Sequence, residues 1–328
     1  ETDLGERILQ LLGQKPSHIV MPAIHLKREE VGRMFEQKGI SHEQGNYDPT
    51  YLTACAREHL RNQFMEAGAG MTGCNFGVAA TGDVVVCTNE GNADMSTSMP
   101  KLHLVAMGIE KIVPDYQSLA VFQRLLCRSA TGQPTTAYTS HFRQARPGGE
   151  MHVILVDNGR SDILADPDHW ETLKCIRCGS CMNTCPVYRR SGGYSYTYFI
   201  PGPIGINLGM LRDPRRYSDN VSACTLCLSC DNVCPTHVNP GSQVYLWRQR
   251  LDGLGRANES KKLMSEGMEL LFEHPALYAS ALSLAPLANL VPDNLTHIRP
   301  LNPWGVGHAM PHFARESFHT LWKKGKVK

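Results

Sequence analysis

Apolar residues recur at helical spacing near the start of the chain. In "DPTYLTACAREHLRNQFMEAG" every fourth position is apolar, which predicts a helix with one buried face: Leu52, Ala56, Leu60 and Phe64. Asp48 and Pro49 are residues typical of a helix start. Gly68 is expected to end this helix in the left-handed conformation.

Short apolar runs then alternate with a second helical segment. "FGVAATGDVVVCT" predicts two strands around a turn at Thr81–Asp83, while "HLVAMGIEKIVP" and "EMHVILVDNG" each hold a further buried run. "DYQSLAVFQRLLCRSATG" predicts a helix with Leu119, Phe122 and Leu126 on one face. Strands that alternate with helices predict an α/β domain whose mainly parallel sheet is covered by helices.

The pattern changes near residue 165. "ADPDHWETLKC" predicts a short helix that begins at the cap residue Asp166 and leads to Cys175. Beyond residue 236 only helical patterns occur, and "NESKKLMSEGMELLFEHP" is expected to end as a helix before Pro275. The final thirty residues show no clear period until their end and are expected to form a tail that packs over another surface. We therefore expect three parts, at 1–165, 166–255 and 256–328.

Composition and charge describe an ordinary globular protein. Of its 328 residues 42% are hydrophobic and 20% charged, and 33 basic against 31 acidic residues give no reason to expect a nucleic-acid groove. The longest apolar run, Ala276–Val291, contains Pro286 and is too short to span a membrane. The first residues are charged and resemble no signal peptide. We expect a cytoplasmic protein, and peripheral membrane association remains open.

Eight of the twelve cysteines lie in two matching runs, "CIRCGSCMNTCP" and "CTLCLSCDNVCP". Each run is spaced by two, two and three residues and ends in proline. The other cysteines are scattered singly: Cys55, Cys74, Cys87 and Cys127. A small secreted disulfide scaffold would spread its cysteines through a short chain, so this distribution favours a reducing compartment and metal binding.

The spacing of both runs is that of bacterial ferredoxins with cubane iron–sulfur clusters. In two-cluster proteins the fourth cysteine of each run binds the other cluster. We therefore predict two [4Fe–4S] clusters with crossed ligands. The first would be held by Cys175, Cys178, Cys181 and Cys234, and the second by Cys224, Cys227, Cys230 and Cys185. The alternative is a pair of structural zinc sites, although these usually combine two C-x2-C pairs separated by a long spacer.

The segment between the runs is long, with 38 residues between Cys185 and Cys224. Its Gly-Gly and Pro-Gly-Pro segments interrupt regular structure, and helical patterns flank it, which predicts the helical type of two-cluster domain. Its arginines either offset the negative charge of a cluster or form a solvated basic loop: Arg189, Arg190, Arg212, Arg215 and Arg216. Its tyrosines either pack the clusters or line a partner groove: Tyr188, Tyr194, Tyr196 and Tyr198.

These motifs together resemble the lactate utilisation protein B family. "CIRCGSCMNTCPVYRRSGGYSYTYFIPGPIG" resembles its iron–sulfur region, "TGCNFGVAATGDVVVCTNEGN" and "HVILVDNGRS" its lactate-utilisation (LUD) domain, and "WGVGHAMPHFARESFHTLW" its C-terminal segment. The resemblance implies a fold like that of sugar-phosphate isomerases and CoA-transferases for residues 1–165. Members carry a longer N-terminal part, so this first domain is expected to lack that part.

The resemblance also implies a role. The family acts with a cysteine-rich-domain protein and a small separate LUD-domain protein to oxidise L-lactate to pyruvate. This chain would be the iron–sulfur electron-transfer component of that dehydrogenase system and not a complete enzyme. Two alternative functions remain. One is a LUD-domain enzyme that binds a nucleotide or acyl anion and uses its clusters as a scaffold or sensor. The other is a ferredoxin-like adaptor of another dehydrogenase. No G-x-G-x-x-G follows a predicted strand, which disfavours a built-in dinucleotide site.

The LUD segment offers further candidate residues. Backbone amides around four residues near predicted strand ends can bind an anion, or the glycines can simply serve the turns: Thr72, Gly73, Asn75 and Gly82. Glu90 is either an acid–base or nucleophilic group or part of a solvated turn. Cys74 is either a buried inert thiol or a reactive one. His25 and His103 lie near the predicted sheet, where single histidines are usually structural.

Overall fold

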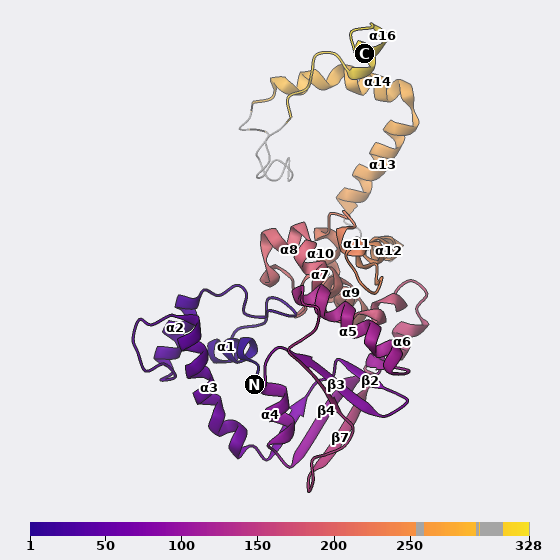
Figure 1. Cartoon of the computed structure of the whole chain (residues 1–328). Coiled ribbons are helices and arrows are strands. Elements are labelled where there is room, and N and C mark those ends of the chain that lie inside the picture. Colours follow the sequence, from indigo (N-terminus) through magenta and orange to yellow (C-terminus); the bar gives the residue numbers. More distant parts are fainter. Residues whose placement is uncertain (254–258, 293–294, 296–310, 328) are drawn as a thin grey trace. The chain divides into compact units, whose positions relative to one another are not determined.

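A computed structural model describes residues 1–253, 259–292, 295 and 311–327. The chain divides into two compact units, Glu1–Gly253 and Leu254–Lys328, and each is described by itself. The first unit holds both sheets and both cysteine runs (Figure 1).

Three helices open the first unit: α1 (Leu4–Leu12), α2 (Arg28–Gln37) and α3 (Pro49–Glu66). The carboxylate of Asp48 accepts hydrogen bonds from the backbone N–H of Thr50 and Tyr51, which confirms the predicted start of α3. Its predicted end is wrong. The helix ends at Glu66, the next residue Ala67 is extended, and Gly68 does not have a positive φ. The chain runs directly from this helix into the next strand, so no left-handed turn is needed.

The strands form two sheets instead of one. The parallel sheet has the order β1-β4-β7 and consists of β1 (Ala69–Thr72), β4 (Leu102–Gly108) and β7 (Glu150–Val156). The mixed sheet has the order β5-β2-β3-β6 and consists of β5 (Ile112–Val113), β2 (Phe76–Val78), β3 (Asp83–Thr88) and β6 (Tyr138–Phe142). The predicted hairpin is present, with Phe76 opposite Val85 and Gly82 at φ 75°, but it belongs to the mixed sheet.

Three helices connect these strands: α4 (Asn92–Ser98), η1 (Ile109–Lys111) and α5 (Tyr116–Thr131). The short helix α6 (Arg160–Ala165) follows the last strand. Helix α5 buries Leu119 and Leu126 and half-buries Phe122, as its sequence pattern predicts. Val84 of the mixed sheet packs with Val105 and Met107 of the parallel sheet, so a shared core joins the two sheets.

Residues 157–253 contain helices and no strand, which confirms the helical type of cluster domain. The elements are η2 (Trp170–Lys174), α7 (Ser180–Thr184), α8 (Pro186–Ser191), η3 (Gly193–Ser195), α9 (Gly202–Arg212), α10 (Pro214–Ala223), α11 (Ser229–Asn232) and α12 (Pro240–Gly253). Asp166 does not begin a helix here, because it closes α6 and its carboxylate binds the Arg250 guanidinium at 2.9 and 3.2 Å.

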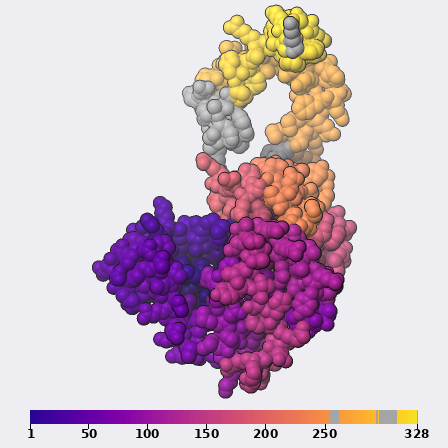
Figure 2. Space-filling model, viewed as in Figure 1, coloured from indigo at the N-terminus to yellow at the C-terminus, as the bar shows by residue number. Residues whose placement is uncertain are grey.

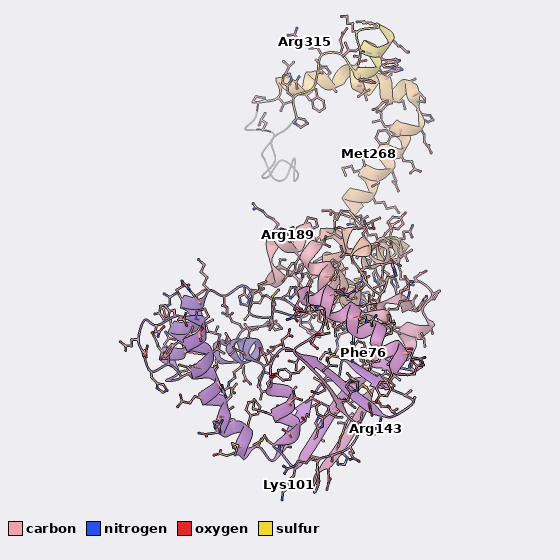
Figure 3. All side chains as sticks on the ribbon, in the orientation of Figure 1. Phe76, Lys101, Arg143, Arg189, Met268 and Arg315 are labelled. Carbon is pink, nitrogen blue, oxygen red and sulfur yellow. The ribbon has the colours of Figure 1, made fainter. Side chains whose placement is uncertain are left out.

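The first cysteine run packs directly onto the α/β half of the unit. Figure 2 shows the two halves of this unit as one continuous surface. Ile176 and Cys178 share one core with residues of the mixed sheet and α5: Phe76, Val78, Val85, Val113, Leu119 and Leu126. Phe76 lies inside this core, beside Phe122 (Figure 3). In addition, the Ser180 hydroxyl donates to the Ser129 carbonyl at 2.6 Å. The cysteine loop is therefore part of the folded core of the sheet.

The second unit contains α13 (Glu259–Glu273), α14 (Pro275–Leu284), η4 (Ala285–Leu290) and α16 (Phe318–Lys323). Helix α13 ends before Pro275, as predicted. Within the described ranges, no helix combines the length and apolar character needed to cross a bilayer. Residues 299–310 and 328 of the predicted tail lie outside the described residues, so its packing stays a prediction.

The shared core predicts the effect of truncating α5. We expect Leu119→Ala to lower the free energy of unfolding by about 2–5 kcal/mol, because Leu119 is 2% exposed and the change leaves a cavity. Val121→Ala on the same helix is the control, since Val121 is 56% exposed, and it should change stability by about 0.5 kcal/mol or less. Chemical denaturation followed by circular dichroism measures both. Equal losses in the two variants would contradict this core.

Candidate metal centre

The two cysteine loops follow the same backbone path. In the first, Arg177 and Gly179 have φ values of 63° and 79°. At the matching positions of the second, Leu226 and Leu228 have φ values of 54° and 57°. A left-handed conformation costs a leucine roughly 1–2 kcal/mol. Gly179 adopts this conformation without cost, whereas Arg177, Leu226 and Leu228 do so at a cost. The path places the first three cysteines of each run around one cavity.

The first cavity is lined by four cysteines, three from the first run and one from the second: Cys175, Cys178, Cys181 and Cys234. Its remaining wall is mostly apolar, with Ile19, Ile176, Ile204 and Val238 among the lining residues. These are the four cysteines that sequence spacing assigns to the first cluster.

The second cavity shows the reciprocal arrangement. Its cysteines are Cys185 from the first run and three from the second: Cys224, Cys227 and Cys230. Val187, Ile206 and Leu228 contribute apolar wall, and Tyr196 is also part of the lining. Each cavity thus combines cysteines from both runs.

The surroundings of the sulfur atoms suit bound thiolates. Burial raises the pKa of the thiols of Cys178, Cys181 and Cys224, so the free thiols stay neutral unless a metal takes the place of the proton. Backbone N–H groups approach three sulfur atoms, at 3.3 Å for Cys234, 3.4 Å for Cys224 and 3.5 Å for Cys185. Such N–H groups stabilise negative charge on sulfur.

The positions of the thiols also bear on the zinc alternative. Among the side chains that the structure describes, no three from His, Cys, Asp and Glu meet closely enough to hold a single metal ion. The thiols instead surround a cavity in sets of four. This arrangement fits a polynuclear cluster with cysteine ligands better than one tetrahedral zinc ion.

Asp231 supports the second cavity, a role that sequence analysis missed. Its carboxylate accepts hydrogen bonds from the backbone N–H of Gly241 at 2.5 Å and of Ser242 at 3.0 Å, at the start of α12. Gly241 thereby approaches the cavity so closely that a Cβ there would lie 3.2 Å from Cys230 Sγ. The only sequence signal was the position of Asp231 directly after the third cysteine of the run.

Tyr196 lies near thiols of both cavities. Its hydroxyl is buried, and no hydrogen-bond partner for it occurs in the described part of the chain. Burial raises the pKa of Tyr196, and the neighbouring thiols of Cys185, Cys224 and Cys181 raise it further. The phenol therefore remains a neutral donor in the lining of the second cysteine cavity.

Comparison with known proteins agrees with this geometry. The chain matches the LUD domain over residues 1–161, a 4Fe-4S dicluster domain over 171–238 and the C-terminal region of lactate utilisation protein B over 250–327. It is 39% identical to lactate utilization protein B of Bacillus cytotoxicus, over 99% of this chain and 71% of that protein. The chain belongs to the lactate utilisation protein B family.

Another relative carries a different name. The chain is 37% identical to the Escherichia coli protein named uncharacterized electron transport protein YkgF, over 99% of this chain and 70% of that protein. The Shouchella clausii lactate utilization protein B is 38% identical, over 100% of this chain and 71% of the relative. No solved structure matches the chain. The dicluster match and the cysteine-lined cavities make this member of the family an iron–sulfur protein.

The arginines between the runs lie on the surface. All five are exposed (Figure 3 labels Arg189), and Arg212 also lines a separate cavity described below. The hydroxyl groups of Tyr188 and Tyr194 each donate at 2.6 Å to a backbone carbonyl of the N-terminal segment, those of Ser17 and Lys15. These contacts favour a packing role for both tyrosines over the lining of a partner groove.

Two of the predicted anion-binding residues of the LUD domain, Thr72 and Asn75, make hydrogen bonds within the protein. The Thr72 hydroxyl lies 2.9 Å from Nε2 of His103, and the Asn75 side chain accepts from the Cys87 N–H at 2.8 Å. Gly82 forms the hairpin turn, and Gly73 has open space beside it. Anion binding by their backbone amides stays a prediction.

The remaining LUD candidates have contrasting surroundings. Glu90 lines an open cavity together with Arg57, Met95 and Met99, and burial raises its pKa above the usual range. Burial also raises the pKa of the Cys74 thiol, which donates to the Phe76 carbonyl at 2.8 Å and so favours the inert alternative. His25 is exposed, and its Nδ1 lies 2.7 Å from the Ser17 hydroxyl.

Crossed ligation predicts which cluster is affected when the fourth cysteine of one run is replaced. We expect Cys185→Ser to perturb the cluster associated with Cys224, Cys227 and Cys230, because Cys185 lines that cavity and not the first. Cys234→Ser should have the opposite selectivity. Electron paramagnetic resonance of the reduced protein distinguishes the two clusters. If each variant instead lost the cluster of its own run, the crossing would be refuted.

Tyr196→Phe tests the buried phenol. Hydrogen bonds to cluster sulfurs stabilise the reduced, more negative state, so removing the hydroxyl should lower the potential of the second cluster. The expected shift is on the order of 50 mV, close to a tenfold change for one electron. Tyr245→Phe is the control, because Tyr245 is exposed on α12. A redox titration that finds the same potential in wild type and Tyr196→Phe would exclude this role.

Proposed function

We propose that this chain holds two [4Fe–4S] clusters and transfers electrons in a multi-protein system that oxidises L-lactate to pyruvate. One observation supports the two clusters: the chain has a pair of cavities, each lined by four cysteines that come from both runs. Membership in the lactate utilisation protein B family supports the proposed role in L-lactate oxidation. A relative named as an electron transport protein supports the redox role.

Residues of the chain have distinct tasks in this proposal. The eight thiolates would hold the clusters, and apolar side chains such as Ile204 and Ile206 keep water from the cavities. Backbone N–H groups beside Cys185, Cys224 and Cys234 offset negative charge on sulfur. Clusters bound there would accept and release one electron at a time, whereas oxidation of L-lactate to pyruvate removes two electrons and two protons.

This difference requires a division of labour. The sequence carries no dinucleotide fingerprint after a predicted strand, so we place the two-electron step on a partner or at an interface. The partners we propose are a cysteine-rich-domain protein and a small separate LUD-domain protein. The chain would then be one component of a lactate dehydrogenase complex.

A second candidate function rests on the cavity beside Glu90. The raised pKa of Glu90 is typical of an acid–base group, and Arg57 and Arg61 on the same cavity wall can pair with an anion. This observation favours a LUD-domain enzyme that acts on a nucleotide or acyl anion. The two candidates differ in whether the isolated chain catalyses a reaction.

Reconstitution tests the proposed function. Anaerobically purified protein should contain about eight iron atoms per chain, since each cubane holds four. The chain alone should not reduce a dye with L-lactate, and adding both partners should produce lactate-dependent reduction. Cys178→Ser should still assemble with the partners, because Cys178 is buried in the first cavity, yet turnover should fall by at least tenfold.

The matched control is Cys55→Ala, which alters a buried cysteine of α3 outside both cavities and should retain turnover. Stoichiometric zinc without labile sulfide would overturn the iron–sulfur assignment. If the isolated chain oxidised lactate and Glu90→Gln abolished this activity, the catalytic site would lie in the LUD domain.

A further inference from the structure

A large cavity lies where the α/β half meets the cysteine-rich half of the first unit. Its volume is about 530 Å³. One wall contains Glu110 and Asn158–Arg160, which follow the carboxyl ends of the parallel strands β4 and β7. The opposite wall comes from η2, α9 and α12. In open α/β sheets, ligands bind outside the carboxyl ends of the strands where the strand order reverses. The order β1-β4-β7 contains no such reversal, so the case for a ligand rests on the lining of the cavity.

The charges on this wall leave two cations without ion pairs. Arg160 is paired with Glu110, and Arg250 with Asp166. Arg177 and Arg212 make no ion pair with any described residue, and the exposed Asp162 is the one other carboxylate of the lining. The lining therefore carries one net positive charge, and two guanidinium groups are available to an anion.

Two buried donors point to the same kind of ligand. Within the described residues, Nη1 of Arg177 and Nε1 of Trp247 are buried without a hydrogen-bond partner, and both residues line the cavity. Trp247 is only 3% exposed. A buried donor without a partner costs about 1–3 kcal/mol. Because both groups can only donate, oxygen atoms of a phosphate or carboxylate would complement them.

Aromatic and aliphatic side chains form the rest of the lining. The rings of Tyr198 and Phe199 lie 4.5 Å apart, and Phe199 remains 59% exposed although it is a large apolar residue. Ile163, Leu173 and Leu211 add aliphatic surface. The charges of Arg212, Arg177 and Arg160 oppose the burial that raises the pKa of Tyr198, so the aromatic and cationic parts of the wall are close together.

Arg177 connects this cavity to the first cysteine cavity. It lies between Cys175 and Cys178 in the sequence and lines both cavities. A ligand in contact with its guanidinium group would therefore lie one side chain away from the first set of cysteines.

We propose that this cavity binds an aromatic organic anion of mononucleotide size, with its phosphate or carboxylate on Arg177 and Arg212 and its planar ring against Tyr198 and Phe199. The volume falls within the range of about 300–1,000 Å³ found for small-molecule pockets. The site lies outside the cysteine cavities and the Glu90 cavity. It does not depend on lactate oxidation, because binding is a property of the isolated chain.

Calorimetry on the anaerobically purified, cluster-containing chain tests the proposal. The probes are FMN and AMP, each compared with its phosphate-free form, riboflavin or adenosine, and with inorganic phosphate and L-lactate. At least one nucleotide should bind at least tenfold more tightly than its phosphate-free form and than inorganic phosphate. Arg212→Gln should weaken that nucleotide at least tenfold, while Arg215→Gln, an equal charge change at an exposed residue outside the cavity lining, should not.

Phe199→Ala tests the ring contact at an exposed residue, where the substitution leaves the core intact. It should weaken the nucleotide and its phosphate-free form by similar factors of at least threefold. The proposal is overturned if neither nucleotide binds, if Arg212→Gln and Arg215→Gln weaken binding equally, or if Phe199→Ala leaves binding unchanged. Binding of L-lactate that depends on Arg212 without binding of either nucleotide would also overturn it, because the site would then recognise only a small carboxylate.

Discussion

The rest of the cysteine-rich half depends on one constraint, the closure of two cavities by cysteines from two distant runs. Each cavity takes three cysteines from one run and the fourth from the other. Both runs must therefore be in place before either cavity is complete. The helices between Cys185 and Cys224 bring the chain back, and leucines in the second loop adopt left-handed backbone that they would otherwise avoid. Because burial raises the pKa of thiols such as Cys181 and Cys224, we expect metal binding to be coupled to folding of this half.

The α/β half is tied to this arrangement through a common core. Ile176 and Cys178 pack among side chains of the mixed sheet and α5, so the first cysteine loop cannot move as an independent module. The cavity of about 530 Å³ between the two halves, called here the junction cavity, is lined by residues that follow β4 and β7 and by residues of α9 and α12. Arg177 lines both the junction cavity and the first cysteine cavity. The position of the proposed ligand site beside the first cysteine cavity thus follows from how the two halves share their interior.

Electrostatics distinguish the cavities. The cysteine cavities have mostly apolar walls, whose donors include backbone N–H groups, the Tyr196 phenol and, in the first cavity, the Arg177 guanidinium group. The junction cavity has guanidinium groups without ion pairs, whereas the cavity beside Glu90 combines a carboxylate of raised pKa with Arg57 and Arg61. Chemically different ligands are therefore expected in different parts of one unit, which is why electron transfer and ligand binding can be tested separately.

The sequence by itself determined the features that depend on short-range spacing. The two C-x2-C-x2-C-x3-C-P runs identify the cysteines of each set, and Asp48, Pro49 and the fourfold apolar spacing identify α3. Such signals are local because a loop or a helix face is specified by neighbouring residues. Tertiary structure decided the partition of strands into two sheets, the pairing of Asp166 with Arg250, and the meeting of Arg177, Arg212 and Trp247 around one cavity. Strand pairing, ion pairs and cavity walls join residues far apart in the chain, and no local pattern specifies which distant segments will meet.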